Sequence, residues 1–454
     1  FINGFYNRVF YQIGVCNEFL RQTTDGKLDE RGVDGTLRDE IQNYRAEARF
    51  MRALSYWHAM DLFANPPFVT EEDPIGAFFP EQIQRADLFN YIEAELLDIE
   101  NSIVGARQNE YGRADRAAVW MLLAKLYLNA EVYTGTGRYA DALAYTNNVI
   151  SAGYTVSSNP YEYLFLADND SNGSESEVIF PIPFDGLRTQ GFGGMTFLVH
   201  APVGGNMNPD DYGINGGWAG VRTTSTFVNK FDEEIDLDAY NMSLGTLSDW
   251  GIVGSATPNG WGDPDEDMYE VGTDQYMLYL ELTAGELKFR FDNDWAINLG
   301  DTGADGTLEQ DGANIAIAED GIYAVSLDVA NLTYSIELFE GDGRANFFTD
   351  GQSLEIVDIS PFNNGYAVEK YRNVDVNGIA GSDSTGDFPD TDFPMFRLAD
   401  AYLMYAEATL RGGGGSMSQA VDYINTLRER AYGSDIGNIS ESDISISTYT
   451  EQLS

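Results

Sequence analysis

The sequence predicts a multidomain protein of the α plus β class, in which an inserted β-sandwich interrupts a helical-repeat domain with long loop regions. Apolar residues recur every three or four positions over 112–150 and again over 396–431, which is the period of one helix face. Within 246–340 apolar and polar residues instead alternate, as is typical of half-buried strands. We therefore expect a discontinuous helical domain, residues 1–245 and 341–454, around an insert at 246–340.

Residues 112–150 predict two helices packed back to back. The first helix matches the tetratricopeptide motif W-x2-L-G-x2-Y at three positions, Trp120, Leu123 and Tyr127, and has Ala124 in place of the glycine. Two glycines break the chain before the second helix. A single repeat cannot bury its apolar face alone, so we expect this hairpin and the later one near the C-terminus to share a core. An ordinary helical hairpin is the alternative interpretation.

Other segments have weaker patterns. Helices are predicted over three further ranges: 5–20, 37–63 and 85–104. The second of these has three arginines that we expect on a solvated or salt-bridged face: Arg45, Arg49 and Arg52. Residues 177–183 are predicted as a short strand. Residues 185–220 are predicted as a glycine-rich loop region, and loops this long are usually functional or disordered.

The composition limits the possible partners. The formal net charge is -47, from 73 acidic and 26 basic residues, and it disfavours nucleic acid and anionic lipid as partners. Only one cysteine, Cys16, and two histidines, His58 and His200, are present, which argues against disulfides, thiolate metal sites and histidine-based catalysis. No apolar run is long enough to span a membrane, and no signal peptide is recognisable. The chain begins with FINGFYNRVF and ends with TYTEQLS, and we expect further segments at both ends.

Aromatic residues make up 13% of the chain, and flat rings suit the faces of sugars. A sugar-binding site needs an aromatic platform and a few hydrogen-bonding groups. In the insert, the candidate residues are Trp261, Trp295, Lys288 and Asn298. In the helical domain, they are Trp218, Phe68 and Phe78. The alternative for the insert is that one of its tryptophans belongs to the core of the sandwich.

No catalytic constellation stands out. Acidic residues are so numerous that any carboxylate pair is weak evidence for a glycosidase. Residues 168–173 copy the start of a calcium-binding loop, but Ile179 stands where the bidentate glutamate would be, so a polar turn is favoured. We expect no catalytic residues, no cofactor and no metal in this loop. A structural calcium ion elsewhere stays possible.

Seven stretches resemble the SusD/RagB family, the lipoproteins that cap outer-membrane glycan importers. They are RAEARFMRA (45–53), GRA (112–114), LAKLYL (123–128), SEVIF (176–180), GW (217–218), GDGR (341–344) and RLADAYLMYAEA (397–408). The resemblance implies a non-catalytic protein on the extracellular face of the outer membrane, partnered by a SusC-like TonB-dependent transporter. It also implies a lipid anchor on a cysteine that this chain lacks.

The insert resembles a second group, the starch-binding modules of SusE/SusF lipoproteins. The similar stretches are 252–261, 282–290, 295–300, 321–323 and 334–336. This resemblance implies that the ligand is an α-glucan, starch or maltooligosaccharide, which the protein would capture and deliver to the transporter. Two alternatives remain: a secreted glycoside hydrolase with a binding module, and a repeat scaffold that binds protein partners.

Overall fold

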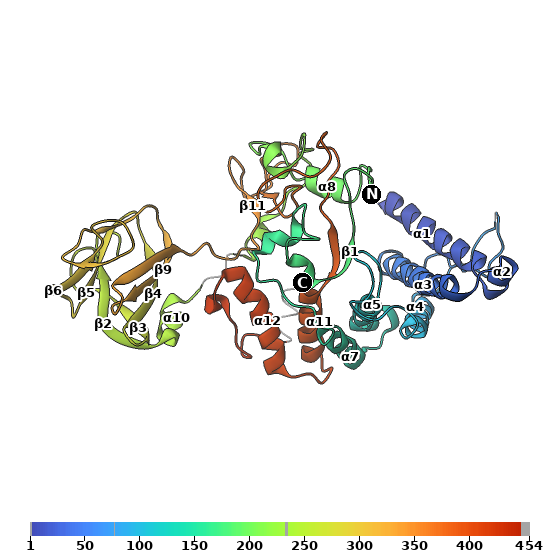
Figure 1. Ribbon diagram of the computed structural model, residues 1–454, viewed down its shortest axis with the longest axis horizontal. Helices are drawn as coiled ribbons and strands as arrows, with labels where there is room; N and C mark the ends of the chain where they lie inside the picture. Colours follow the sequence, from blue (N-terminus) through green and yellow to red (C-terminus); the bar gives the residue numbers. More distant parts are fainter. Residues whose placement is uncertain (1, 77, 232–234, 446–454) are drawn as a thin grey trace. The chain divides into compact units, whose positions relative to one another are not determined.

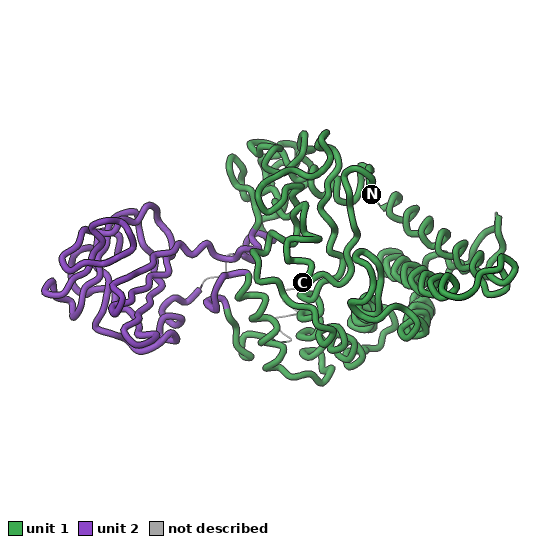
Figure 2. The backbone as a smooth tube through the Cα atoms, viewed as in Figure 1, with its two compact units in different colours: residues 1–225, 346–430, 438–454 green, residues 226–345, 431–437 purple. Residues whose placement is uncertain are grey.

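The computed structural model describes residues 2–76, 78–231 and 235–445 (Figure 1). The chain divides into two compact units, drawn in green and purple (Figure 2). Unit 1 comprises residues 1–225, 346–430 and 438–454, and unit 2 comprises residues 226–345 and 431–437. Helices dominate unit 1 and antiparallel strands dominate unit 2, which confirms the predicted fold class. The stretch TYTEQLS lies outside the described residues.

The long helices lie where the apolar period predicted them, whereas short helices such as α2 and α6 were not predicted. Their bounds are α1 Ile2–Gln22, α2 Asp25–Glu30, α3 Gly35–Phe63, α4 Arg85–Ile99, α5 Arg116–Leu128, α6 Ala130–Thr134, α7 Tyr139–Ile150, α11 Leu398–Leu410 and α12 Met417–Tyr432. A helix of five or six residues is too short to show a period. Within the described part of the chain, no helix is both long and apolar enough to cross a membrane.

Local chemistry explains the helical hairpin formed by α5 and α7. Asp115 caps α5 by accepting hydrogen bonds from the N–H groups of Ala117 and Ala118, at 2.8 and 3.2 Å. Ala124 is fully buried, and a small side chain at this position lets α7 approach closely. Helix α7 also packs against α11, and both hairpins contribute to one hydrophobic core. The expectation that the two hairpins share a core is therefore confirmed.

A two-stranded sheet joins distant parts of unit 1. The predicted strand is present as β1, Val178–Ile182, and it pairs antiparallel with β13, Phe393–Arg397. The apolar stretch that we assigned to a helix from residue 396 therefore starts as a strand, and α11 begins only at Leu398. Phe180 and Phe396 are register partners and are both buried, so packing between the strands decides the conformation of this stretch.

The glycine-rich region is ordered rather than structureless. Its short elements, with those nearby, are η1 Tyr161–Phe165, η2 Ser174–Glu177, α8 Met195–His200, η3 Pro209–Tyr212, α9 Ser225–Val228, β11 Phe347–Phe348 and β12 Ala367–Val368. Met195, Val199 and Tyr212 are buried together with Ala367 in a small core. This core holds the loops in place without a long helix or strand.

Unit 2 is built on one antiparallel sheet. Its strands are β2 Thr246–Val253, β3 Glu266–Gly272, β4 Gln275–Leu282, β5 Gly285–Phe291, β6 Asp294–Gly300, β7 Glu309–Gln310, β8 Ile315–Ile317, β9 Gly321–Asp328 and β10 Thr333–Leu338. The strand order is β10-β9-β4-β3-β2-β5-β6-β7, and β8 also pairs with β5. Strand β3 was not predicted from the sequence. Met268 is its only buried residue, and the strand is rich in acidic residues.

The sheet curls until its two ends meet. Thr307 pairs with Thr333, and the N–H of Leu308 donates to the carbonyl oxygen of Leu332 at 2.7 Å. The curled sheet encloses a core of apolar side chains: Trp250, Ile252, Met268, Leu287, Phe289, Val325 and Leu327 among others. Facing layers around one core are the arrangement expected of the predicted sandwich.

Unit 2 extends beyond the predicted insert at both ends. Helix α10, Leu237–Leu244, precedes β2, and Asn241 in this helix exchanges two hydrogen bonds with the backbone of Tyr279 at 2.7 and 2.8 Å. Residues 431–437, which include the 3-10 turn η4 (Asp435–Gly437), belong to the same unit. Tyr279 is buried beside Tyr240, Ala431, Tyr432 and Ile436, so segments on both sides of the predicted range complete this part of the unit.

Candidate functional site

Two tryptophans form a paired aromatic surface in unit 2. Trp261 lies in the loop between β2 and β3, and Trp295 is the second residue of β6. The centroids of the two indole rings lie 6.1 Å apart, and the ring planes meet at 32°. The exposed fractions are 39% for Trp261 and 45% for Trp295. Neither ring is in the core, where Trp250 is the buried tryptophan instead.

The two predicted polar partners lie nearby, but the structure buries them. The Nζ of Lys288 donates to the Oδ1 of Asn298 at 2.8 Å, and Lys288 is only 9% exposed. The Nδ2 of Asn298 donates to the carbonyl oxygen of Trp295 at 2.9 Å and to the Oδ1 of Asp311 at 2.8 Å. Both side chains therefore hold the backbone next to Trp295. Direct contact between them and a ligand stays a prediction.

Trp218 is a separate aromatic surface in unit 1. Its ring stacks on His200, with centroids 5.0 Å apart and planes 20° from parallel, and Trp218 is 42% exposed. His200 is buried, and its ring nitrogens lie 2.7 Å from the carbonyl oxygen of Gly216 and 3.0 Å from that of Asp387. His200 thus connects its own helix with the segments at Gly216 and Asp387, beneath Trp218. This role is structural.

Phe68 and Phe78 line one hollow of about 540 Å³ in unit 1. The lining combines aromatic rings with carboxylates and amides, and it includes Phe79, Asp73, Glu81, Gln82, Gln84 and Asp87. Apolar faces beside hydrogen-bonding groups are the composition expected of a sugar site. The structure therefore brings Phe68 and Phe78 together. Both are distant in the sequence from Trp218 and from the tryptophan pair of unit 2.

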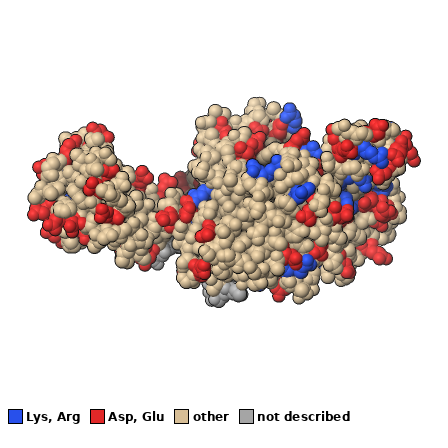
Figure 3. Space-filling model, turned by 60° about the horizontal axis from the view of Figure 1, so that its bottom comes forward, with Lys and Arg blue, Asp and Glu red and all other residues tan. Residues whose placement is uncertain are grey.

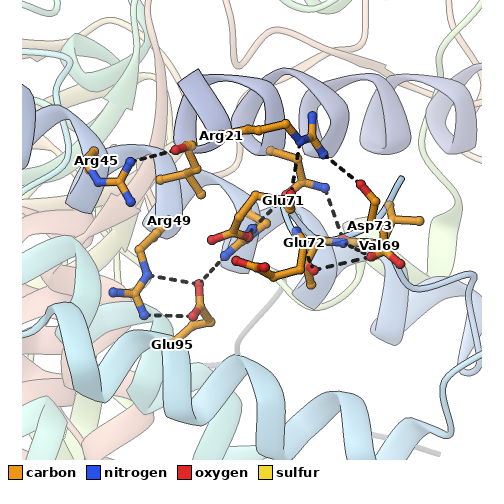
Figure 4. A network of polar contacts seen from close by, with 12 residues as sticks. Arg21, Arg45, Arg49, Val69, Glu71, Glu72, Asp73 and Glu95 are labelled. Atoms are coloured by element: carbon orange, nitrogen blue, oxygen red, sulfur yellow. Dashed lines mark hydrogen bonds and ion pairs between the residues drawn. The ribbon is translucent and has the colours of Figure 1, made fainter. Parts of the chain in front are cut away.

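A network of charged side chains around the buried Arg52 holds the loop that lines this hollow (Figure 4). Arg52 is only 2% exposed, and its guanidinium group pairs with Glu71 of the loop and with Glu95 of α4. Arg21 of α1 donates to the carbonyl oxygen of Glu71 at 3.0 Å (Figure 4). Arg49 forms the salt bridges expected of it, with Glu95 and Asp98. Of the two alternatives predicted for Arg52, a solvated or a salt-bridged side chain, the structure shows the second, because Arg52 is buried and paired with both glutamates.

Residues 168–173, which resemble the start of a calcium-binding loop, form a hydrogen-bonded turn. The carboxylate of Asp168 accepts hydrogen bonds from the Nδ2 of Asn172 at 3.1 Å and from the N–H of Val376 at 3.3 Å. Across residues 2–76, 78–231 and 235–445, no three His, Cys, Asp or Glu side chains are grouped to hold a metal ion. Calcium binding stays a prediction.

Arg290, which lies beneath Trp295, was not predicted as a site residue. The guanidinium carbon is 4.9 Å from the centroid of the Trp295 ring. Hydrogen bonds to Asp265 raise the pKa of Arg290 above its ordinary value. Its position on β5, two residues after Lys288, was the one available signal.

Comparison with known proteins identifies the family. The sequence profile of the SusD family matches residues 176–451, so this chain belongs to the SusD family. The starch-binding protein SusD of Bacteroides thetaiotaomicron is 34% identical over 427 residues, which cover 94% of this chain. This chain spans 63% of the length of that relative.

Solved structures share the fold at lower identity. A SusD-like carbohydrate-binding protein of Bacteroides fragilis has a TM-score of 0.58 at 15% identity, over 100% of this chain and 69% of its own. A SusD superfamily protein of Parabacteroides distasonis has a TM-score of 0.55 at 19% identity, over 97% of this chain and 69% of its own. Surface glycan-binding protein A of Bacteroides thetaiotaomicron, in complex with laminarihexaose, has a TM-score of 0.54 at 15% identity, over 99% and 72%. At these identities the similarity shows a common fold, not a common ligand.

Proposed function

We propose that this protein is a non-catalytic, cell-surface glycan-binding protein that captures an α-glucan. The observation that carries the proposal is the pair of exposed rings of Trp261 and Trp295. A ring with one open face can stack on the apolar face of a sugar, and the acidic, hydroxyl-accepting surroundings suit an uncharged ligand. Membership of the SusD family supports the proposal, as does 34% identity to a protein named for starch binding.

The geometry of the pair favours a curved glycan. The two ring planes differ by 32°, so sugars stacked on both rings must turn relative to one another. Successive sugars of an α-glucan turn relative to one another, whereas a flat β-glucan ribbon would suit parallel rings. The resemblance of residues 246–340 to starch-binding modules supports the same choice, starch or maltooligosaccharide.

Trp218, with Phe68 and Phe78, is proposed as further glycan-contacting surface on unit 1. The ring of Trp218 is supported on one face by His200, and the two phenylalanines line the same hollow. We place the protein at the extracellular face of the outer membrane, held by a lipid anchor. A SusC-like TonB-dependent transporter is the proposed recipient of the glycan. Co-purification of the transporter from native membranes tests that partnership.

Titration of the whole protein with maltoheptaose tests the binding proposal. Truncation of a buried anchor at an interface typically costs about 2 kcal/mol, so Trp261→Ala and Trp295→Ala should each weaken binding about thirtyfold. Both rings are partly exposed, so both variants should unfold at nearly the wild-type temperature. Tyr11→Ala removes an exposed aromatic ring of α1 and should bind as the wild type does. Absence of binding at millimolar maltoheptaose would contradict the proposal.

A reducing-end assay separates this function from that of a glycoside hydrolase. The purified protein incubated with starch should release no new reducing ends. Release that disappears on substitution of one carboxylate would instead establish hydrolysis.

A further inference from the structure

We propose that Arg290 is the positioning residue that sets Trp261 and Trp295 relative to one another, an inference that rests on the proposed glycan-binding function. Arg290 is the next-to-last residue of β5 and is only 2% exposed. A buried guanidinium group is stable only if carboxylates and hydrogen bonds compensate the loss of water. The groups that contact Arg290 therefore indicate its role. They are the ring of Trp295 and the loop that carries Trp261.

The first contact supports Trp295. The guanidinium carbon of Arg290 lies 4.9 Å from the centroid of the Trp295 ring. A cation over the face of an indole attracts it, and the attraction is stronger where water is excluded. Arg290 occupies the inner face, and the 45% exposure of Trp295 leaves the outer side open to a ligand. The cation thus fixes the plane of this ring.

The second contact fixes the loop that carries Trp261. The Nε of Arg290 donates to both carboxylate oxygens of Asp265, at 3.0 and 2.8 Å. Its Nη2 donates to Asp265 and also to Asp263. These aspartates lie two and four residues after Trp261, so the same guanidinium group holds the loop of one tryptophan and the ring of the other.

The neighbouring residues make room for this arrangement. A Cβ atom at Gly251 would lie 2.7 Å from the Cβ of Asp265, so glycine at this position lets Asp265 lie against β2. The N–H of Asp265 donates to the Oδ1 of Asn293 in the turn between β5 and β6, at 2.6 Å. The turn just before Trp295 is thereby joined to the Trp261 loop a second time.

The planar fork of arginine is needed for the two roles together. A lysine ammonium group can satisfy one carboxylate as a point charge, but it cannot bind Asp265 in two places and stack flat under an indole. Arg290→Lys should therefore keep the charge balance and the fold while loosening the Trp295 ring.

The experiment removes the charges as a pair. Arg290→Met alone would leave Asp265 buried without a partner, so the main variant is Arg290→Met/Asp265→Leu, which replaces both groups by apolar side chains. The unfolding temperature of the whole protein should stay near that of the wild type. The affinity for maltoheptaose should fall about tenfold in the double variant and also in Arg290→Lys, because each variant loses the contact that fixes Trp295.

A spectroscopic readout tests the ring geometry without any ligand. Two indoles 6.1 Å apart couple electronically and give paired circular-dichroism bands, which can be isolated by subtracting the spectrum of Trp295→Phe. The paired bands should weaken in both Arg290 variants. They should be unchanged in Glu286→Gln, a control at the exposed end of the same strand.

The outcomes separate the two proposals. If the wild type does not bind maltoheptaose, the proposed function fails, and the paired bands still decide whether Arg290 orients the rings. If the wild type binds, while a folded Arg290 variant keeps both wild-type affinity and the paired bands, the positioning role is overturned. If the double variant does not fold, Arg290→Lys decides by the same two measurements.

Discussion

The surroundings of the Asp392 carboxyl group disfavour its ionised form. Burial raises the pKa of Asp392 from its ordinary value to about 6. Its Oδ1 accepts a hydrogen bond from the N–H of Phe184 at 2.7 Å, and Asp170 and Asp390 add negative charge nearby. Because the folded pKa is higher than the unfolded pKa, the folded state binds more protons between about pH 4 and pH 6. The contribution of this group to the free energy of unfolding therefore falls as pH rises through that window.

Asp392→Asn should remove this pH dependence. An asparagine keeps the oxygen that accepts from Phe184 and has no charge to bury. We expect the free energy of unfolding at pH 7 to increase by about 1–2 kcal/mol, since a shift of two pKa units is worth at most about 2.7 kcal/mol and solvent screening reduces it. Urea denaturation at pH 4 and pH 7 measures the change, which should vanish at pH 4. Asp358→Asn is the control, because hydrogen bonding lowers the pKa of Asp358; an equal gain there would contradict the explanation.

The residues of the tryptophan site were only partly predictable. Trp261, Trp295, Lys288 and Asn298 were selected from the sequence because sugar sites combine aromatic and polar groups, and the structure gathers all four in one part of unit 2. Arg290 was missed because nothing in its own neighbourhood shows that Asp263 and Asp265 fold back onto it. Contacts across a loop and a strand depend on tertiary structure, which periodicity does not encode.

The same limit applies to secondary-structure elements. Long helices lie close to their predicted ranges, and the alternating strands β4, β5, β9 and β10 lie within the predicted insert 246–340, because their apolar periods extend over many residues. Helix α10 is eight residues long and was not predicted. Phe396 was assigned to a helix, yet pairing with β1 draws it into β13, which is a case of tertiary contacts overriding local preference.

Helix α10 leads to a prediction about the excised insert. The predicted range 246–340 omits Asn241, whose two hydrogen bonds to the backbone of Tyr279 are buried. Each such bond contributes about 1 kcal/mol, and Tyr240 covers Tyr279 as well. A fragment of residues 226–345 should therefore be about 2–3 kcal/mol more stable than one of residues 246–340, as measured by calorimetry.

A point variant checks that α10 is the cause. Asn241→Ala in the longer fragment should lose most of the difference, because it leaves the N–H and carbonyl oxygen of Tyr279 without these partners. Both fragments retain Trp261 and Trp295, so their affinities for maltoheptaose should agree. Equal unfolding temperatures for the two fragments would show that α10 does not support the sheet.

At the scale of the whole molecule, the charge of -47 constrains which glycans can bind. Figure 3 shows one face of the surface, where acidic side chains are spread widely. Between residues 246 and 340 the only basic residues are Lys288 and Arg290. Both are buried, the first against Asn298 and the second against Asp265, so the insert presents mainly negative charge to a ligand.

A carboxymethylated maltooligosaccharide should therefore bind more weakly than the neutral sugar. We expect about tenfold weaker binding at low ionic strength, and most of the loss should be recovered at 1 M salt, where the Debye length falls to about 3 Å. Binding of neutral maltoheptaose should change little over the same range, because stacking on Trp261 and Trp295 involves no net charge. A hydroxyethyl derivative of similar size separates charge from steric bulk. If it loses as much affinity as the carboxymethyl derivative, and salt restores neither, then the shape of the tryptophan site rather than the field of the protein excludes substituted glycans.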